Sequence, residues 1–177
     1  MRRAFCGAAL FLALGATTRL GAQASAGVSS EFVEARGQSI VTMGKMPLDA
    51  ESKLGAFYGF AGRIQNAPAK ELTLHLVRSG TQWAWAYDHT VVLILDDKSR
   101  MPLPRALRST SVGEDYMLEQ IMMPLSREQA AQIAQAHKVE MKVGSNDFVW
   151  SDTLQRAFRQ IVEAADGSAP QPAAGTR

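Results

Sequence analysis

Histidines and the carboxylates beside them are the residues of this chain best suited to metal or acid–base chemistry. The sequence contains three histidines, His75, His89 and His137. His89 follows Asp88 and lies close in sequence to Asp96 and Asp97, a set of nitrogen and oxygen donors that a metal ion accepts. The chain has no HExxH, no H-x-H and no loop with calcium-ligand spacing. We therefore expect no metal site, and we expect His137 to sit at a helix end, where a cationic side chain suits the helix dipole.

The sequence does not support nucleophilic catalysis either. No G-x-S-x-G sequence is present, so Ser79-Gly80 and Ser111 are interpreted as turn residues rather than as exposed nucleophiles. Asp96 and Asp97 are adjacent at a predicted strand end, so their side chains should point in different directions and not form an acid–base pair. We expect no catalytic residue and no cofactor, and the sequence favours a protein that is not an enzyme.

Three aromatic residues, Trp83, Trp85 and Tyr87, are the remaining ligand-binding candidates. They alternate with Ala84 and Ala86, which predicts a strand with all three rings on one face. If that face is inside, the rings supply much of the core. If it is outside, they form a flat platform for sugars or partner proteins. Burial is the favoured interpretation, because large aromatic residues in a central strand are usually core.

The stretch from Glu71 to Asp96 should position these candidates. Alternating Leu72, Leu74 and Leu76 predict a half-buried strand, the three aromatics predict a second, and the apolar run from 91 to 95 predicts a third. Short connections make an antiparallel meander the simplest topology. Further strands are expected over 54–64 and 116–125 and an edge segment over 101–104, with a polar loop over 105–115 between the last two.

The C-terminal third predicts two helices. Ser126 and Gln129 form a capping box for the first, and Asp152 with Gln155 should start the second. The second carries a buried stripe at helical spacing, made of Leu154, Ala157, Phe158, Ile161, Val162 and Ala165. The alternation of Val139, Met141 and Val143 predicts a strand between the two helices. The expected fold class is α+β, with a mainly antiparallel sheet of about six to eight strands and the two C-terminal helices packed on it.

The N-terminus has the pattern of an export signal. Basic Met1-Arg2-Arg3 precedes an apolar run of 13 residues, Ala4–Ala16, which is too short for a membrane span. Ala22-Gln23-Ala24 is an A-x-A cleavage site, and cleavage is expected after Ala24 or Ala26. The expected organisation is a signal peptide over 1–24, a weakly structured lead-in over 25–53, one α+β domain over 54–166 and a disordered tail over 167–177.

Charge narrows the choice of partner. The full chain has a net charge of +2, and removal of Arg2, Arg3 and Arg19 with the signal leaves a net charge of −1. A near-neutral chain without basic clusters argues against nucleic acid as a partner. After cleavage no integral membrane segment and no cysteine would remain, so we expect a protein of the periplasm or the extracellular space without disulfides.

The run A-x-x-V-E-x-K-V-G-x-x-x-F, residues 136–148, resembles the C-terminal part of small exported bacterial proteins of unknown function. The resemblance implies location and style of fold and assigns no functional residue. Together these features predict an exported, non-enzymatic protein that binds a protein or cell-envelope partner. The alternative is a small-molecule or glycan-binding module that uses Trp83, Trp85 and Tyr87.

Overall fold

A computed structural model describes residues 27–167, which form ten strands, a short 3-10 turn (Glu34–Arg36) and two α-helices. The larger of two antiparallel sheets has six strands in the order β1-β2-β3-β4-β8-β7. Its strands are β1 (Val28–Val33), β2 (Gln38–Pro47), β3 (Ser52–Ala61), β4 (Glu71–Gly80), β7 (Leu107–Val112) and β8 (Met117–Ser126). The predicted α+β class with a mainly antiparallel sheet is confirmed, with more strands than the six to eight expected.

The smaller sheet has four strands in the order β10-β9-β5-β6. Its strands are β5 (Val91–Leu95), β6 (Ser99–Pro102), β9 (Val139–Val143) and β10 (Asn146–Val149). A three-residue connection, residues 96–98, joins β5 to β6, and its first two residues, Asp96 and Asp97, adopt left-handed φ angles of 53° and 59°. Such turns match the twist of a hairpin, and aspartate tolerates this conformation. The edge segment predicted over 101–104 is confirmed in part, since β6 is an edge strand.

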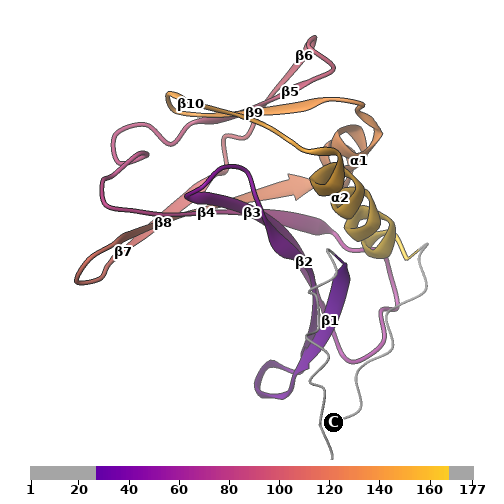
Figure 1. Cartoon of the computed structure of the whole chain (residues 1–177). Coiled ribbons are helices and arrows are strands. Elements are labelled where there is room, and N and C mark those ends of the chain that lie inside the picture. Colours follow the sequence, from indigo (N-terminus) through magenta and orange to yellow (C-terminus); the bar gives the residue numbers. More distant parts are fainter. Residues whose placement is uncertain (1–26, 168–177) are drawn as a thin grey trace, which may run out of the picture.

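Both helices lie on the same side of the six-stranded sheet (Figure 1). Helix α1 (Arg127–Gln135) contacts β4 and β8, and helix α2 (Asp152–Ala165) contacts β1, β2 and β3. The predicted capping box of α1 is present, with Ser126 accepting from the Gln129 amide and the Gln129 side chain accepting from the Ser126 amide. In α2 the N-cap is Ser151, one residue before the predicted Asp152. Every member of the predicted α2 stripe is buried.

One apolar core includes residues from both sheets and both helices. On β4 and β8 it follows strict alternation, so Leu72, Leu74 and Leu76 are buried opposite Leu125, Met123 and Ile121. The residues between them on each strand are half-buried. The same inward row continues beyond the leucines to Arg78 on β4 and Glu119 on β8, which lie directly opposite each other. The core therefore ends, at this end of the sheet, in charged side chains.

The predicted meander is wrong. Strand β4 continues through the expected turn at Arg78-Ser79-Gly80, residues 81–90 form a loop without strand structure, and β5 belongs to the other sheet. The alternation of Trp83, Trp85 and Tyr87 does not reflect a strand, and two amides of this loop, those of Ala84 and Trp85, donate to a side-chain carboxylate in place of a neighbouring strand. The connection crosses between sheets.

Two segments are more ordered than their sequences indicated. Residues 28–47 were expected to form part of a weakly structured lead-in, yet they form β1 and β2, and Val41 and Met43 enter the core. The polar loop predicted over 105–115 contains β7, an edge strand of the larger sheet. Both segments pair with long neighbours that supply register, so weak local patterning is overridden by the sheet. The expected signal peptide and the tail beyond residue 167 lie outside the described residues. None of the helices in residues 27–167 has the length and hydropathy needed to cross a membrane.

Candidate functional site

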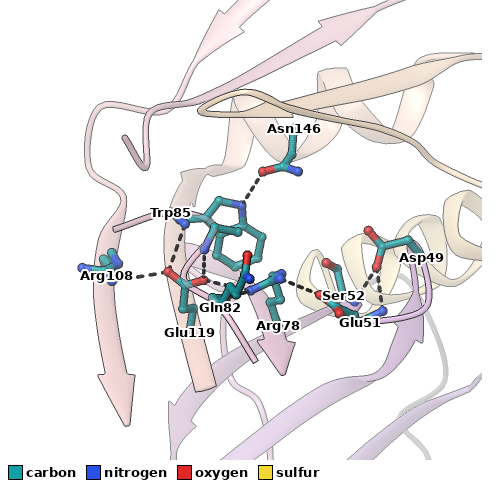
Figure 2. A network of polar contacts seen from close by, with 10 residues as sticks. Asp49, Glu51, Ser52, Arg78, Gln82, Trp85, Arg108, Glu119 and Asn146 are labelled. Carbon is teal, nitrogen blue, oxygen red and sulfur yellow. Dashed lines mark hydrogen bonds and ion pairs between the residues drawn. The ribbon is translucent and has the colours of Figure 1, made fainter. Parts of the chain in front are cut away.

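A fully buried carboxylate, that of Glu119 on β8, organises the charged end of the core. Each of its oxygens accepts one main-chain amide and one guanidinium (Figure 2). Oε1 accepts the Trp85 amide at 3.0 Å and Nη2 of Arg108 at 3.3 Å. Oε2 accepts the Ala84 amide at 2.8 Å and Nη1 of Arg78 at 3.3 Å. A buried charge persists only when paired and hydrogen-bonded in this way.

Arg78 extends this network to the neighbouring turn. Its side chain is 14% exposed, and its Nη1 also donates to the Gln82 carbonyl at 2.6 Å. Its Nη2 donates to Oε2 of Glu51, the residue before β3. The turn before β3 is itself fixed by Asp49, whose Oδ1 accepts the amides of Glu51 and Ser52 at 2.9 and 2.6 Å. Charges within the network balance, since two arginines face two glutamates.

Arg108, on edge strand β7, is held less completely. Its guanidinium lies 5.6 Å from the centre of the Trp83 ring, a cation–π arrangement. Among the described residues its buried Nε has no hydrogen-bond partner. The side chain is 22% exposed and turns inward from the edge of the sheet toward Glu119. It therefore connects the carboxylate to the exposed indole.

Trp85 anchors the loop over residues 81–90 and is itself 0% exposed. Besides the amide bond to Glu119, its Nε1 donates to Oδ1 of Asn146 at the start of β10, at 3.2 Å (Figure 2). At the same β9–β10 turn, Gly144 donates to the Thr90 carbonyl at 3.0 Å. A Cβ added at Gly144 would lie 2.5 Å from the Asp88 carbonyl oxygen, so only glycine allows this approach. The loop is thus fixed to both sheets.

The three candidate aromatics are not equivalent. Trp85 is buried, Trp83 is 39% exposed, and Tyr87 is fully exposed. Burial was the favoured interpretation for all three, and among them it describes Trp85 alone. Because Trp85 points into the protein, the three rings do not share one flat surface. Trp83 and Tyr87 are what the loop presents to solvent.

The β7–β8 hairpin carries further exposed apolar side chains, of which Leu107 pairs with Met122 on the outward face of the sheet, opposite the face that Arg108 shares with Glu119. Leu107, Val112 and Tyr116 are all large and exposed. Between the start of the loop and the hairpin tip lies a hollow of about 210 Å³, open to solvent and lined by Thr81, Val112 and Tyr116 among others. We call residues 81–90 and 107–117 together the loop–hairpin end. In Figure 1 it lies at the opposite end of the larger sheet from β1.

The residues considered for metal chemistry have structural partners. Asp96 accepts the amides of His137 and Lys138 at 2.8 and 2.9 Å, and these bonds lower the pKa of its carboxyl. Asp97 pairs with Lys138 Nζ at 2.7 Å. Within residues 27–167 no three His, Cys, Asp or Glu side chains gather closely enough to hold a metal ion. Helix α1 ends at Gln135, two residues before His137.

The other two histidines, His75 and His89, lie on different elements of the fold. His75 faces outward from β4, where its Nε2 is 2.8 Å from the Gln120 side chain. Burial lowers its pKa, with a smaller opposing effect from that hydrogen bond. His89 is exposed and lines a second open hollow, of about 220 Å³, with Pro102 and Pro104. Asp88 beside it caps its own turn by accepting the Thr90 amide, which lowers its pKa.

The comparisons with protein-family models, curated proteins and solved structures found no match to this chain. The geometry of the loop–hairpin end therefore carries the functional argument. The buried carboxylate that supports this end, Glu119, and the arginines that pair with it, Arg78 and Arg108, were missed by the sequence analysis. A signal was present, because Glu119 and Arg78 continue the inward period of Ile121 and Leu76, where a charge must be paired.

Proposed function

We propose that this is an exported, non-enzymatic protein that binds a protein or cell-envelope partner through the loop–hairpin end. One observation carries the proposal. Among residues 27–167, seven large hydrophobic side chains are exposed, and five of them lie in the loop–hairpin end: Trp83, Tyr87, Leu107, Val112 and Tyr116. A concentration of exposed large apolar residues in one part of a fold is typical of an interaction surface.

The chemistry of the five side chains fits protein recognition. Three are aromatic, and tryptophan and tyrosine are enriched where binding energy is concentrated. Arg108 lies behind the Trp83 ring and adds a cationic group that is 22% exposed. Glu114 and Asp115 at the hairpin tip provide exposed polar groups at the rim. The end thus offers apolar, cationic and acidic side chains, a combination that is usual in interfaces.

The loop that carries Trp83 is held rigidly by the rest of the protein, which also supports a binding role. A loop that must order on binding loses affinity to the ordering entropy. Here the Glu119 carboxylate holds two consecutive loop amides, and Trp85 fills the core beneath them. Trp83, between Gln82 and Ala84, is therefore displayed from a main chain that is already fixed on both sides. A buried ion network that fixes this one loop favours a functional role for the loop.

Export rests on the sequence, through the basic n-region, the apolar run Ala4–Ala16 and the cleavage site at Ala24. A sugar-stacking platform is the alternative function. It would draw on Trp83 and Tyr87, because the buried Trp85 offers no surface to a ligand.

The test is affinity capture from a cell-envelope extract with the purified protein and two variants. Trp83→Ala/Tyr116→Ala removes two of the exposed aromatic rings, and Ile64→Ala removes an exposed residue elsewhere. We expect a saturable partner that the wild type and Ile64→Ala retain and the double variant loses. Melting temperatures of all three proteins establish that folding is unchanged. Equal retention by the double variant would remove the loop–hairpin end from consideration.

A further inference from the structure

The outer edge of β7 is an open strand edge, and we propose that a second copy of this chain pairs with it, antiparallel, to form a continuous sheet across a two-fold axis. In the described part of the chain, the main chain of residues 107–112 bonds to β8 alone. In an antiparallel strand, alternate residues direct N–H and C=O groups away from the neighbour. Those groups of β7 form a template for another strand. This inference does not depend on the proposed partner.

The other three sheet edges carry features that discourage pairing. Strand β1 has exposed Glu31, β6 is four residues long and ends at Pro102, and β10 is four residues long with exposed Asp147. Short length, charge and proline are the devices by which natural edges avoid association. Strand β7 is six residues long, has no proline, and turns its single charge, Arg108, inward to Glu119. It is the least protected edge among residues 27–167.

Charges at the two ends of β7 favour a second copy as the occupant. Arg105 precedes the strand with a side chain that is 70% exposed, and exposed Glu114 and Asp115 follow it. Antiparallel pairing brings the basic start of one strand to the acidic end of the other, and symmetry does so twice. The Arg105 side chain pairs with Glu71 at 2.7 Å, but an exposed pair of this kind contributes little and is readily exchanged. The edge is therefore complementary to itself.

Symmetry also limits the register. Residues opposite each other across an antiparallel pair point to the same face, so one residue of β7 must pair with its own copy, and the two-fold axis passes between these two copies. An axis between the two copies of Thr110 sets Ser109 opposite Ser111 of the second copy. The same register brings Arg105, two residues before β7, toward the hairpin turn of the second copy, which carries Glu114 and Asp115. A Thr–Thr pair on the axis is itself favourable.

Sedimentation equilibrium of the purified protein, from low to high micromolar concentration, measures the association. We expect a monomer–dimer equilibrium whose dissociation constant rises with salt. Arg105→Glu and Asp115→Arg should each raise that constant by about tenfold, and the two together should restore it toward wild type. Arg63→Glu is the matched control, since Arg63 is an exposed arginine paired with Glu34 far from β7.

A cysteine on the axis tests the register independently of affinity. In a Cys6→Ser background, Thr110→Cys should give a covalent dimer with a short bis-maleimide, and Ser29→Cys on the edge strand β1 should not. Melting curves identify any variant that fails to fold, and Ser109→Cys then replaces Thr110→Cys. A protein that stays monomeric over the whole range would overturn the proposal. So would a dimer that Arg63→Glu weakens equally, that the double charge exchange fails to restore, or that cysteines at β7 do not capture.

Discussion

The amide of Trp85 donates to Oε1 of the buried Glu119 at 3.0 Å, which ties the loop between the two sheets to strand β8 of the larger sheet. The Trp85 ring reaches the other way, to Asn146 of the smaller sheet. One residue thus connects both sheets, and its position depends on one carboxylate. The stability of the protein and the display of Trp83 follow from this pair.

Glu119→Gln should be strongly destabilising. The substitution keeps the side-chain shape but leaves the guanidinium groups of Arg78 and Arg108 facing a neutral amide at a site of no exposure. Breaking a buried ion network from one side costs about 3–5 kcal/mol in the free energy of unfolding. Urea titration measures that free energy.

Glu51→Gln is the matched control for this experiment. Glu51 pairs with the same Arg78, but its side chain is 49% exposed. Its loss should cost about 1 kcal/mol or less. Comparable losses from the two variants would show that burial of Glu119 does not matter energetically.

Alanine substitutions of the two loop tryptophans should differ clearly in their effect on stability. Trp85→Ala empties a fully buried site and should cost about 3–5 kcal/mol, whereas Trp83→Ala removes a partly exposed ring and should change stability by about 1 kcal/mol or less. Trp83→Phe should also reduce iodide quenching of tryptophan emission, because Trp150 and Trp85 are buried. A large loss of stability from Trp83→Ala would contradict this division.

Gly144 tests the close approach of the loop to the β9–β10 turn. Gly144→Ala must accommodate a left-handed φ of 55° and a Cβ only 2.5 Å from the Asp88 carbonyl. Gly62→Ala shares the left-handed conformation, with φ of 80°, but its Cβ meets nothing within 4 Å. The control variant, Gly62→Ala, should lose about 1–2 kcal/mol in the free energy of unfolding, and Gly144→Ala should lose clearly more. Thermal or urea unfolding measures both. Equal losses would mean that the contact with Asp88 yields without cost.

His75 should make stability depend on pH. Burial lowers its pKa in the folded protein, so the unfolded chain binds the proton more readily. The free energy of unfolding should therefore be highest above the unfolded value of about 6.5 and should fall as pH drops below it. His75→Gln should flatten this part of the curve, measured by urea titration at a series of pH values. An unchanged slope in the variant would assign the acid sensitivity to other groups.

Local patterns predicted the parts of the fold that local physics decides. The capping box at Ser126 and Gln129, the buried stripe from Leu154 to Ala165, and the alternation of Val139, Met141 and Val143 are all confirmed. Each depends on contacts with near neighbours in sequence or on one apolar face. Such features are readable because their period is fixed by backbone geometry.

The network around Glu119 could not be predicted from local patterns. Glu119 meets the Trp85 amide across 34 residues and Arg78 across 41, so no sequence spacing reports the network. The period of Trp83, Trp85 and Tyr87 imitated a strand, yet the amides of Ala84 and Trp85 donate to the Glu119 carboxylate and not to a neighbouring strand. Tertiary partners decided the outcome there, as they did for β7, whose polar residues alone predict a loop.

Site-specific photo-crosslinking in cells tests the central claim most directly. A photoreactive phenylalanine analogue would replace Tyr87 or Tyr116 in the loop–hairpin end, and Ile64 or Val149 as exposed controls elsewhere. We predict the same cross-linked partner from positions 87 and 116, and none from positions 64 and 149. Cross-links to that partner from all four positions alike, or from the controls alone, would contradict a binding surface at the loop–hairpin end.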